Sequence, residues 1–259
     1  MTPGPLEARL RERRDGGRKL LVPYVTGGLT DRWLDVLRAF VAAGADAVEI
    51  GIPFSDPVMD GPTIQEASQR ALDQGATPAG VLAALKGVEV GVPLVAMTYY
   101  NVVFRTGHRR FARSLADNGV CGAIVPDVPL EELGEWDRAA DDAGVETVLL
   151  AAPVTPDDRL AEIARRSKGF VYGVSVMGIT GERQTLAESA GVLAKRLKAV
   201  TDKPVLLGFG VSTPEQAVEA AAAADGVVVA SALMRRVLDG AAPDDVAELV
   251  AEMRAALDN

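Results

Sequence analysis

Residues 48–65 read Val48-Glu49-Ile50-Gly51-Ile52-Pro53-Phe54-Ser55-Asp56-Pro57-Val58-Met59-Asp60-Gly61-Pro62-Thr63-Ile64-Gln65. An apolar strand over 45–50 carries one carboxylate near its end. It passes into a loop rich in Pro and Gly, with two more carboxylates, and then enters a helix. Burying a charged Glu without partners is costly, and folds retain such a group where its chemistry is used. Glu49 is therefore the first catalytic candidate, with simple exposure at a strand end as the alternative.

Short apolar runs alternate with amphipathic segments on both sides of this stretch. Predicted strands cover residues 20–25, 47–50, 94–99, 123–125, 147–151, 170–174, 205–208 and 227–230. Predicted helices cover residues 6–14, 33–43, 78–86, 109–118, 130–143, 157–167, 187–200, 214–224 and 244–257. Because a helix follows each strand, we predict an α/β fold, a single (β/α)8 TIM barrel over residues 1–259 with an extra N-terminal helix. The alternative is an open doubly wound sheet, which needs a reversal of strand order that no segment signals.

Composition excludes several classes of protein. The chain has 259 residues, 48% of them hydrophobic, and a net charge of -9, which argues against nucleic acid as the main partner. No apolar run approaches the ~20 residues that span a bilayer, so we expect no membrane association. Residues 6–14 have the pattern of a charged amphipathic helix rather than of a signal peptide. The single cysteine permits no internal disulfide, which fits a cytoplasmic location.

The scarcity of Cys and His also restricts the chemistry. Cys121 and His108 are the only residues of their types, so a zinc site built from Cys and His clusters cannot form. A Ser-His-Asp triad would have to use His108, which we expect in a solvated basic turn. Cys121 is expected as a small core residue just before a strand. No obvious metal-ligand cluster is present, and we expect neither a metal nor a cofactor.

The placement of the lysines argues against a covalent mechanism. Lys19, Lys168 and Lys203 each precede a predicted strand and so belong at the N-terminal rim of a barrel. A Schiff base would need a lysine at the opposite end, where barrel active sites lie. General acid–base catalysis by carboxylates is what remains.

The C-terminal ends of the predicted strands bring polar residues to one mouth. The residues expected there are Glu49, Asp60, Tyr99, Asp127 and Tyr172. Asp56 lies in the same loop as Asp60, and the sequence does not separate the two. Small residues follow the last three strands, in segments 178–181, 208–212 and 230–232. They permit a close backbone approach to an anion, and a phosphate site after strands seven and eight recurs in such barrels.

These segments resemble the tryptophan synthase alpha chain family. The resemblance rests first on residues 49–57 and 60–65, and it extends to 22–27, 99–101, 125–129, 177–181 and 208–212. It implies reversible cleavage of indole-3-glycerol phosphate to indole and glyceraldehyde 3-phosphate. It also implies that the chain works as an alpha subunit with a beta subunit in an alpha2beta2 complex.

The resemblance assigns roles residue by residue. Glu49 would move the protons, Asp60 would bind the indole N–H, and Tyr172 would position the substrate or Glu49. The residues implied in substrate binding are Tyr24, Tyr99 and Phe209, which would line the indole pocket, and Thr180. Those implied at the phosphate are Gly181, Gly210, Ala230 and Ser231. Those implied at the beta-subunit interface are Pro53, Phe54, Asp56, Pro57 and Asn101.

Several positions depart from the family pattern. Met59 stands where Ala is common, and Gly28-Leu29-Thr30 stands where Gly-Asp-Pro is usual. Two alternatives to an alpha subunit therefore stay open. One is a stand-alone indole-3-glycerol phosphate lyase that releases free indole. The other is a binding or regulatory barrel subunit with little activity of its own.

Overall fold

The strands form a closed parallel barrel. The computed structural model describes residues 2–174, 183–208 and 210–259, except for the side chains of 183–187. Within these residues eight strands pair in sequence order, and β8 pairs with β1. The predicted (β/α)8 fold is confirmed, because an open sheet would leave its edge strands unpaired. The strands are β1 (Leu20–Thr26), β2 (Val48–Gly51), β3 (Leu94–Met97), β4 (Val120–Ile124), β5 (Glu146–Ala151), β6 (Val171–Val174), β7 (Val205–Gly208) and β8 (Gly226–Val229).

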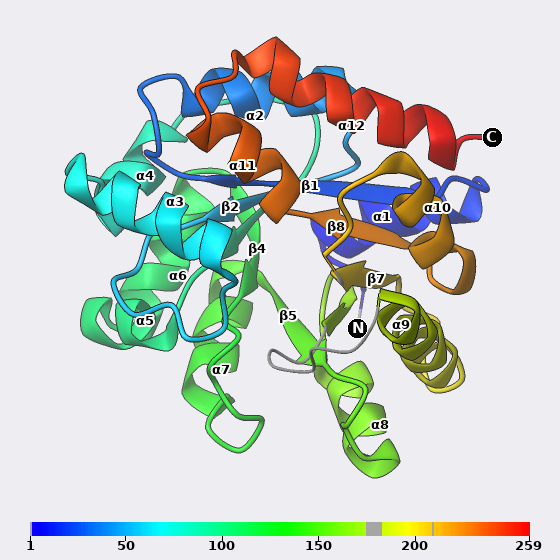
Figure 1. Ribbon diagram of the computed structural model, residues 1–259. Coiled ribbons are helices and arrows are strands. Elements are labelled where there is room, and N and C mark those ends of the chain that lie inside the picture. The colour runs from blue at the N-terminus through cyan, green and yellow to red at the C-terminus, as the bar shows by residue number, and fades with distance from the viewer. Residues whose placement is uncertain (1, 175–182, 209) are drawn as a thin grey trace.

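Helices surround the barrel, as Figure 1 shows. They are α1 (Pro5–Asp15), α2 (Trp33–Ala42), α3 (Pro62–Asp73), α4 (Pro78–Ala84), α5 (Tyr100–Thr106), α6 (His108–Asp117), α7 (Gly134–Ala143), α8 (Asp157–Arg166), α9 (Arg183–Lys198), α10 (Pro214–Ala223), α11 (Ser231–Leu238) and α12 (Pro243–Leu257). None of the helices in the described ranges is both long enough and apolar enough to cross a membrane.

The alternation of side chains along each strand decides what reaches the barrel interior. The apolar interior is one buried cluster that includes Leu20, Val22, Ala47, Val95, Ile124, Val148, Phe170, Leu206 and Val228. Tyr24 of β1, Glu49 of β2 and Tyr172 of β6 each follow a member of this cluster by two positions, after Val22, Ala47 and Phe170 respectively. These three side chains face the same interior and lie nearer the C-terminal ends of the strands.

Helix α1 packs into the N-terminal end of the barrel. Leu6 and Leu10 are fully buried and belong to the interior cluster. Gly122 and Gly169 leave room for Leu6, since a Cβ at either would lie 2.7 or 2.5 Å from its Cδ2 atom. The buried Glu146 carboxylate accepts the backbone N–H groups of Leu6 at 2.7 Å and of the next residue at 3.0 Å. A residue of β5 therefore satisfies the first turn of α1.

Replacing Glu146 with Ala is expected to destabilise the chain by on the order of 2–4 kcal/mol, because two N–H groups at a helix start lose their acceptor. Glu146→Gln is the matched control: it keeps one acceptor oxygen and should cost less. Urea unfolding at neutral pH measures both variants. An Ala variant as stable as the unsubstituted chain would show that α1 does not depend on this contact.

The end of β3 differs from the prediction. The strand stops at Met97 rather than at Tyr99, and Tyr99 is an extended residue that precedes α5. The sequence pattern did not predict α5. Its first N–H, from Tyr100, donates to the Asp127 carboxylate at 2.8 Å. An acceptor from a distant part of the chain thus supports this helix start, and no local pattern reports it.

The single Cys and the single His also lie differently from expectation. Strand β4 begins at Val120, so Cys121 is within the strand and half-buried rather than just before it. His108 is the first residue of α6, not part of a solvated turn. Its ring nitrogens lie 2.9 Å from the Tyr100 hydroxyl and 3.4 Å from the Glu135 carboxylate. His108 therefore joins α5, α6 and α7.

The lysines that precede strands are engaged at the N-terminal rim. Lys19 donates to two carbonyls at the end of α10, at 2.7 and 2.8 Å. Lys168 pairs with Asp137 at 3.1 Å, and Lys203 donates to carbonyls at the end of α8. None of the three is placed for covalent chemistry at the mouth.

Candidate active site

Glu49 and Tyr24 are neighbours at the C-terminal end of the barrel interior. They are paired in the β1–β2 ladder, and both side chains are buried. Tyr172 lies within reach of the charges of Glu49 and Asp60, and burial together with these charges raises its pKa well above the ordinary value. Burial and the same two carboxyls also raise the pKa of Tyr24. Both phenols therefore stay protonated and can donate hydrogen bonds.

The Glu49 carboxyl is built to hold a proton. Its side chain is 4% exposed, and its Oε2 atom has no hydrogen-bond partner within the described part of the chain. Burial raises its pKa to about 8, and the negative charge of Asp60 adds to this effect. Glu49 is thus mainly protonated at neutral pH, as a general acid requires. Its unpartnered oxygen remains available to a ligand.

The Asp60 carboxyl titrates before that of Glu49. Asp60 is buried, and burial raises its pKa to about 6, while a hydrogen bond with Tyr99 acts in the opposite direction. At neutral pH it is therefore mainly ionised beside a protonated Glu49. Two carboxyls whose surroundings separate their pKa values can take different roles in one reaction.

Tyr99 anchors the loop that carries Asp60. Its hydroxyl accepts the backbone N–H of Met59 at 3.0 Å, and its ring stacks on Phe54 with the centroids 5.1 Å apart. At the other end of the loop, Gln65 Nε2 donates to the Asp60 carbonyl at 2.8 Å. These contacts hold Asp60 just before the start of α3. The role of Tyr99 in lining an indole pocket stays a prediction.

The structure distinguishes the carboxylates that sequence reasoning grouped together. Asp56 is exposed, and its carboxylate accepts the Ser55 hydroxyl at 2.6 Å, whereas Asp60 is buried. Asp127, expected at the mouth, is exposed and accepts the Tyr100 N–H at the start of α5. Its observed contact supports a helix start, and it adds no third carboxyl to the pair formed by Glu49 and Asp60.

Two glycines, Gly51 and Gly208, make room for the tyrosines, a role that the sequence analysis did not predict for either. A Cβ at Gly51 would lie 1.7 Å from the Tyr24 hydroxyl oxygen, and a Cβ at Gly208 would lie 2.5 Å from that of Tyr172. Neither distance is compatible with a side chain. Side chains alternate along a strand, and both glycines stand at positions that face the barrel interior. This alternation could have indicated that the two glycines make room there.

The expected phosphate residues lie only partly within the described chain. Gly210 has a φ of +69°, which glycine adopts without strain. Ala230 precedes α11 and Ser231 begins it, and no side chain caps this helix start. The amides of its first turn therefore face no side-chain acceptor, and this end of the helix favours an anion. Thr180, Gly181 and Phe209 lie outside the described residues, as does the whole segment 178–181.

The residues expected at a subunit interface differ in exposure. Asp56 and Asn101 are exposed, Phe54 and Pro57 are half-buried, and Pro53 is buried. Three large apolar side chains in the same two segments are exposed, namely Val58 by 69%, Met59 by 45% and Phe104 by 63%. Val58 and Met59 lie in the loop that carries Asp60, and Phe104 lies in α5.

The described ranges contain no cluster of side chains suited to binding a metal ion. There, no group of three or more His, Cys, Asp or Glu side chains could hold a metal ion. The arrangement of the mouth is instead that of an acid–base site, with two buried carboxyls, the buried Tyr24, the half-buried Tyr172 and an uncapped helix start.

The sequence matches that of one enzyme family along nearly its whole length. A family model described as tryptophan synthase alpha chain matches residues 10–258. The tryptophan synthase alpha chain of Thermobifida fusca is 41% identical over 258 residues, covering 97% of this chain and 96% of its own. That of Picosynechococcus sp. is 42% identical over 244 residues, covering 92% of each.

Solved structures agree with this match. A tryptophan synthase chain from M. tuberculosis, in an aminoacrylate- and BRD0059-bound form, has a TM-score of 0.90 and 35% identity over 99% of each chain. Tryptophan synthase subunit alpha from Legionella pneumophila str. Paris has a TM-score of 0.89 and 29% identity over 100% of each. With the fold, the match over residues 10–258 and the identities of these relatives in agreement, the chain belongs to the tryptophan synthase alpha chain family.

Proposed function

We propose that this chain is the alpha subunit of a tryptophan synthase and cleaves indole-3-glycerol phosphate to indole and glyceraldehyde 3-phosphate. The observation that carries the proposal is the pair of buried carboxyls at the mouth, with pKa values raised to about 8 for Glu49 and about 6 for Asp60. Such a pair supplies both a proton donor and an anion in a barrel of this family. Since the described elements surround one barrel, we treat residues 1–259 as one domain.

The chemistry follows from the two protonation states. Protonated Glu49 gives its proton to C3 of the indole ring, and positive charge develops on the ring nitrogen. Glu49, now a carboxylate, takes the proton of the hydroxyl on the adjacent side-chain carbon. The carbon–carbon bond then breaks, its electron pair returns to the indole ring, and the hydroxyl carbon leaves as an aldehyde. Glu49 ends the cycle protonated, as it began.

Asp60 stabilises the intermediate state in this scheme. As the anion of the pair it accepts the indole N–H, whose partial positive charge grows once C3 is protonated. A preorganised acceptor in a buried site is worth more than the same group in water. Tyr172 and Tyr24 border Glu49 as neutral phenols and position the substrate or the acid, while Tyr99 lines the indole pocket and holds the Asp60 loop.

The remaining predicted contacts complete the proposed site. The phosphate would bind the amides of Gly210, Ala230 and Ser231, because the start of α11 is uncapped and favours an anion. Thr180, Gly181 and Phe209 remain assigned by the family resemblance alone. We also propose that the chain acts in the cytoplasm, because its single cysteine suits a reducing compartment.

A beta subunit is the proposed partner, in an alpha2beta2 complex. Exposed Val58, Met59 and Phe104 support a docking surface beside the mouth, because large apolar side chains gathered on a surface mark interaction sites. Asp56, Pro57 and Asn101 lie in the same segments. Pro53 is buried, so we propose that it shapes the loop that carries Asp56 and Pro57 rather than contacting the partner directly.

The test is to measure indole release from indole-3-glycerol phosphate by the purified chain, alone and with a beta subunit. We expect slow release by the isolated chain and a marked increase with the partner, because closure of the loops around such sites commonly depends on binding. Fast release that the partner leaves unchanged would support a stand-alone lyase instead. No release under either condition would leave a barrel with a binding or regulatory role.

A further inference from the structure

One side of the barrel carries a group of arginines without partners. Arg105, Arg109, Arg110, Arg113 and Arg138 make no ion pair or hydrogen bond with any residue of the described ranges. The other arginines with described side chains each engage a carboxylate or, in one case, a backbone carbonyl. In a chain of net charge -9, this local excess of positive charge is unusual. We call these five residues the arginine surface.

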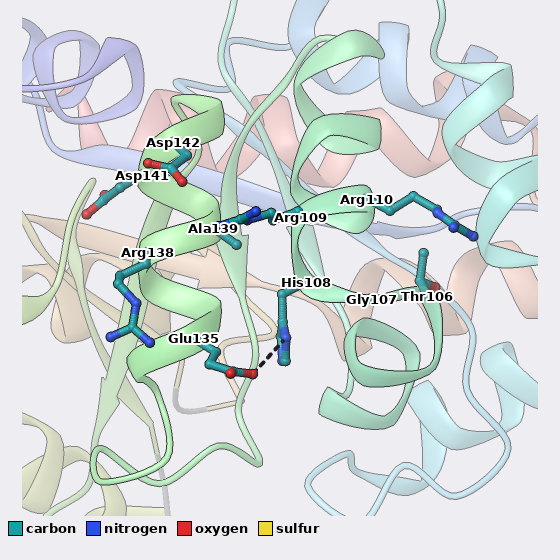
Figure 2. A pocket seen from close by; sticks show the side chains of 10 residues that line it. All are labelled: Thr106, Gly107, His108, Arg109, Arg110, Glu135, Arg138, Ala139, Asp141 and Asp142. Carbon is teal, nitrogen blue, oxygen red and sulfur yellow. Dashed lines mark ion pairs between the residues drawn. The ribbon is translucent and has the colours of Figure 1, made fainter.

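The five side chains belong to one continuous region of α5, α6 and α7. Arg109, Arg110 and Arg138 line a groove of about 640 Å³ between α6 and α7. Arg109 and Arg110 also line the neighbouring hollow, which contains Arg113. Figure 2 shows the groove, with the ring of His108 directed at Glu135 across it. Arg105 lies in the last turn of α5, three residues before His108.

The acidic residues of the groove compensate only part of this charge. They all lie on α7. Glu135 faces His108, Asp141 binds Lys168, and Asp142 has no cationic partner in the described structure. A further carboxylate, Asp117, lines the neighbouring hollow with Arg113. The three carboxylates of the groove and Arg138 lie on α7, whereas Arg109 and Arg110 lie on α6.

The arginines also oppose the stability of their own helix. His108, Arg109 and Arg110 are the first three residues of α6, and its first turn contains no acidic residue. The positive end of the helix dipole disfavours cations at these positions. Arg109 and Arg110 are exposed and make no contact that would offset this effect. Helix stability therefore gives no reason for them, whereas an anionic binding partner does.

We propose that the arginine surface docks a carboxylate-rich face of the beta subunit, an inference that rests on the proposed function. The surface begins beside Asn101 and Phe104 on α5, where the proposed interface ends, so one partner can cover both. Charge complementarity at the rim of an interface steers association and fixes orientation. The rest of this acidic chain repels such a face, which directs it to the arginine surface.

The test compares two double variants that change net charge equally. R109E/R110E alters the arginine surface, and K86E/K195E alters two exposed lysines elsewhere that also have no partner in the described structure. Both variants should fold, and R109E/R110E should raise the melting temperature, since Glu suits the first turn of a helix. The association rate with the beta subunit is measured at about 20 mM and about 300 mM salt.

We expect R109E/R110E to slow association at low salt by about 10–100-fold, with the difference shrinking at high salt, and K86E/K195E to change it far less. Equal effects of the two variants, or no effect of R109E/R110E, would overturn the proposal. The proposal would also be overturned if the wild-type chain did not bind the beta subunit at all. It would likewise be overturned if R109E/R110E weakened only the binding of a single-stranded oligonucleotide probe. Indole release by each isolated variant reports the proposed function separately, because neither variant touches the mouth.

Discussion

Replacing Glu49 with Gln is expected to reduce indole release by ~10²–10⁴-fold, because a positioned acid–base group is worth about that much. The same substitution should make the folded chain more stable at pH 8. Glu49 is buried with one carboxyl oxygen unpartnered, so its ionised form is poorly accommodated. Gln keeps the shape of the side chain and cannot ionise. Activity and stability therefore change in opposite directions.

The pH dependence of this effect has a definite sign. Folding raises the pKa of Glu49 from 4.5 to about 8. Between these values the folded chain holds a proton that the unfolded chain has released. The stabilising contribution of the neutral carboxyl is thus complete below pH 4.5 and is lost as the pH rises toward about 8. The loss is at most roughly 1.4 kcal/mol per pH unit in this window.

Urea unfolding of the wild-type chain and of Glu49→Gln at about pH 5 and about pH 8 measures this effect. The free energy of unfolding of the wild type should fall relative to that of the variant as the pH rises. Asp60 is present in both proteins, so its own titration is largely common to them. Asp56→Asn is the control, because it removes an exposed carboxylate of the same loop. Constant stability differences across this range, or full activity in Glu49→Gln, would contradict the assignment of Glu49.

Much of the fold and the core of the site could be predicted from the sequence. Periodicity identified the alternating strands and helices, and the position of Glu49 at the end of a predicted strand placed it at the mouth of the barrel. The order of the loops placed Asp60 at the same mouth. These features depend on local spacing, which the sequence shows directly.

What the sequence did not show depends on contacts between distant segments. Asp60 differs from Asp56 because Tyr99 and Gln65 hold the loop so that one carboxyl is buried. Helix α5 starts where Asp127, far along the chain, accepts an N–H group. The sequence shows the basic run over 105–113, but that these arginines are unpaired is recognised only once the positions of the neighbouring carboxylates are known.

Placing Ala at Gly51 is expected to disrupt the site almost as strongly as the loss of Glu49. The new Cβ would lie 1.7 Å from the Tyr24 hydroxyl oxygen and 2.3 Å from Cζ, so the ring must move. Tyr24 is buried and receives a hydrogen bond from the Thr26 hydroxyl at 3.3 Å, which leaves it little space. We expect a loss of stability of on the order of 1–3 kcal/mol, as for other overpacked sites. Indole release should fall by about 100-fold or more, because a displaced Tyr24 disturbs its neighbour Glu49.

The same loop provides a matched control for this substitution. A Cβ at Gly61 meets no atom within 4 Å, and its φ of -73° suits any residue, so Gly61→Ala should leave activity and stability nearly unchanged. Tyr24→Leu removes the phenol atoms that collide with the added methyl group, so combining it with Gly51→Ala should recover stability beyond the sum of the single effects. Recovery of stability without activity would separate the space that Gly51 provides from the part that Tyr24 plays in the reaction. An unimpaired Gly51→Ala chain would show that the Tyr24 ring can move without consequence.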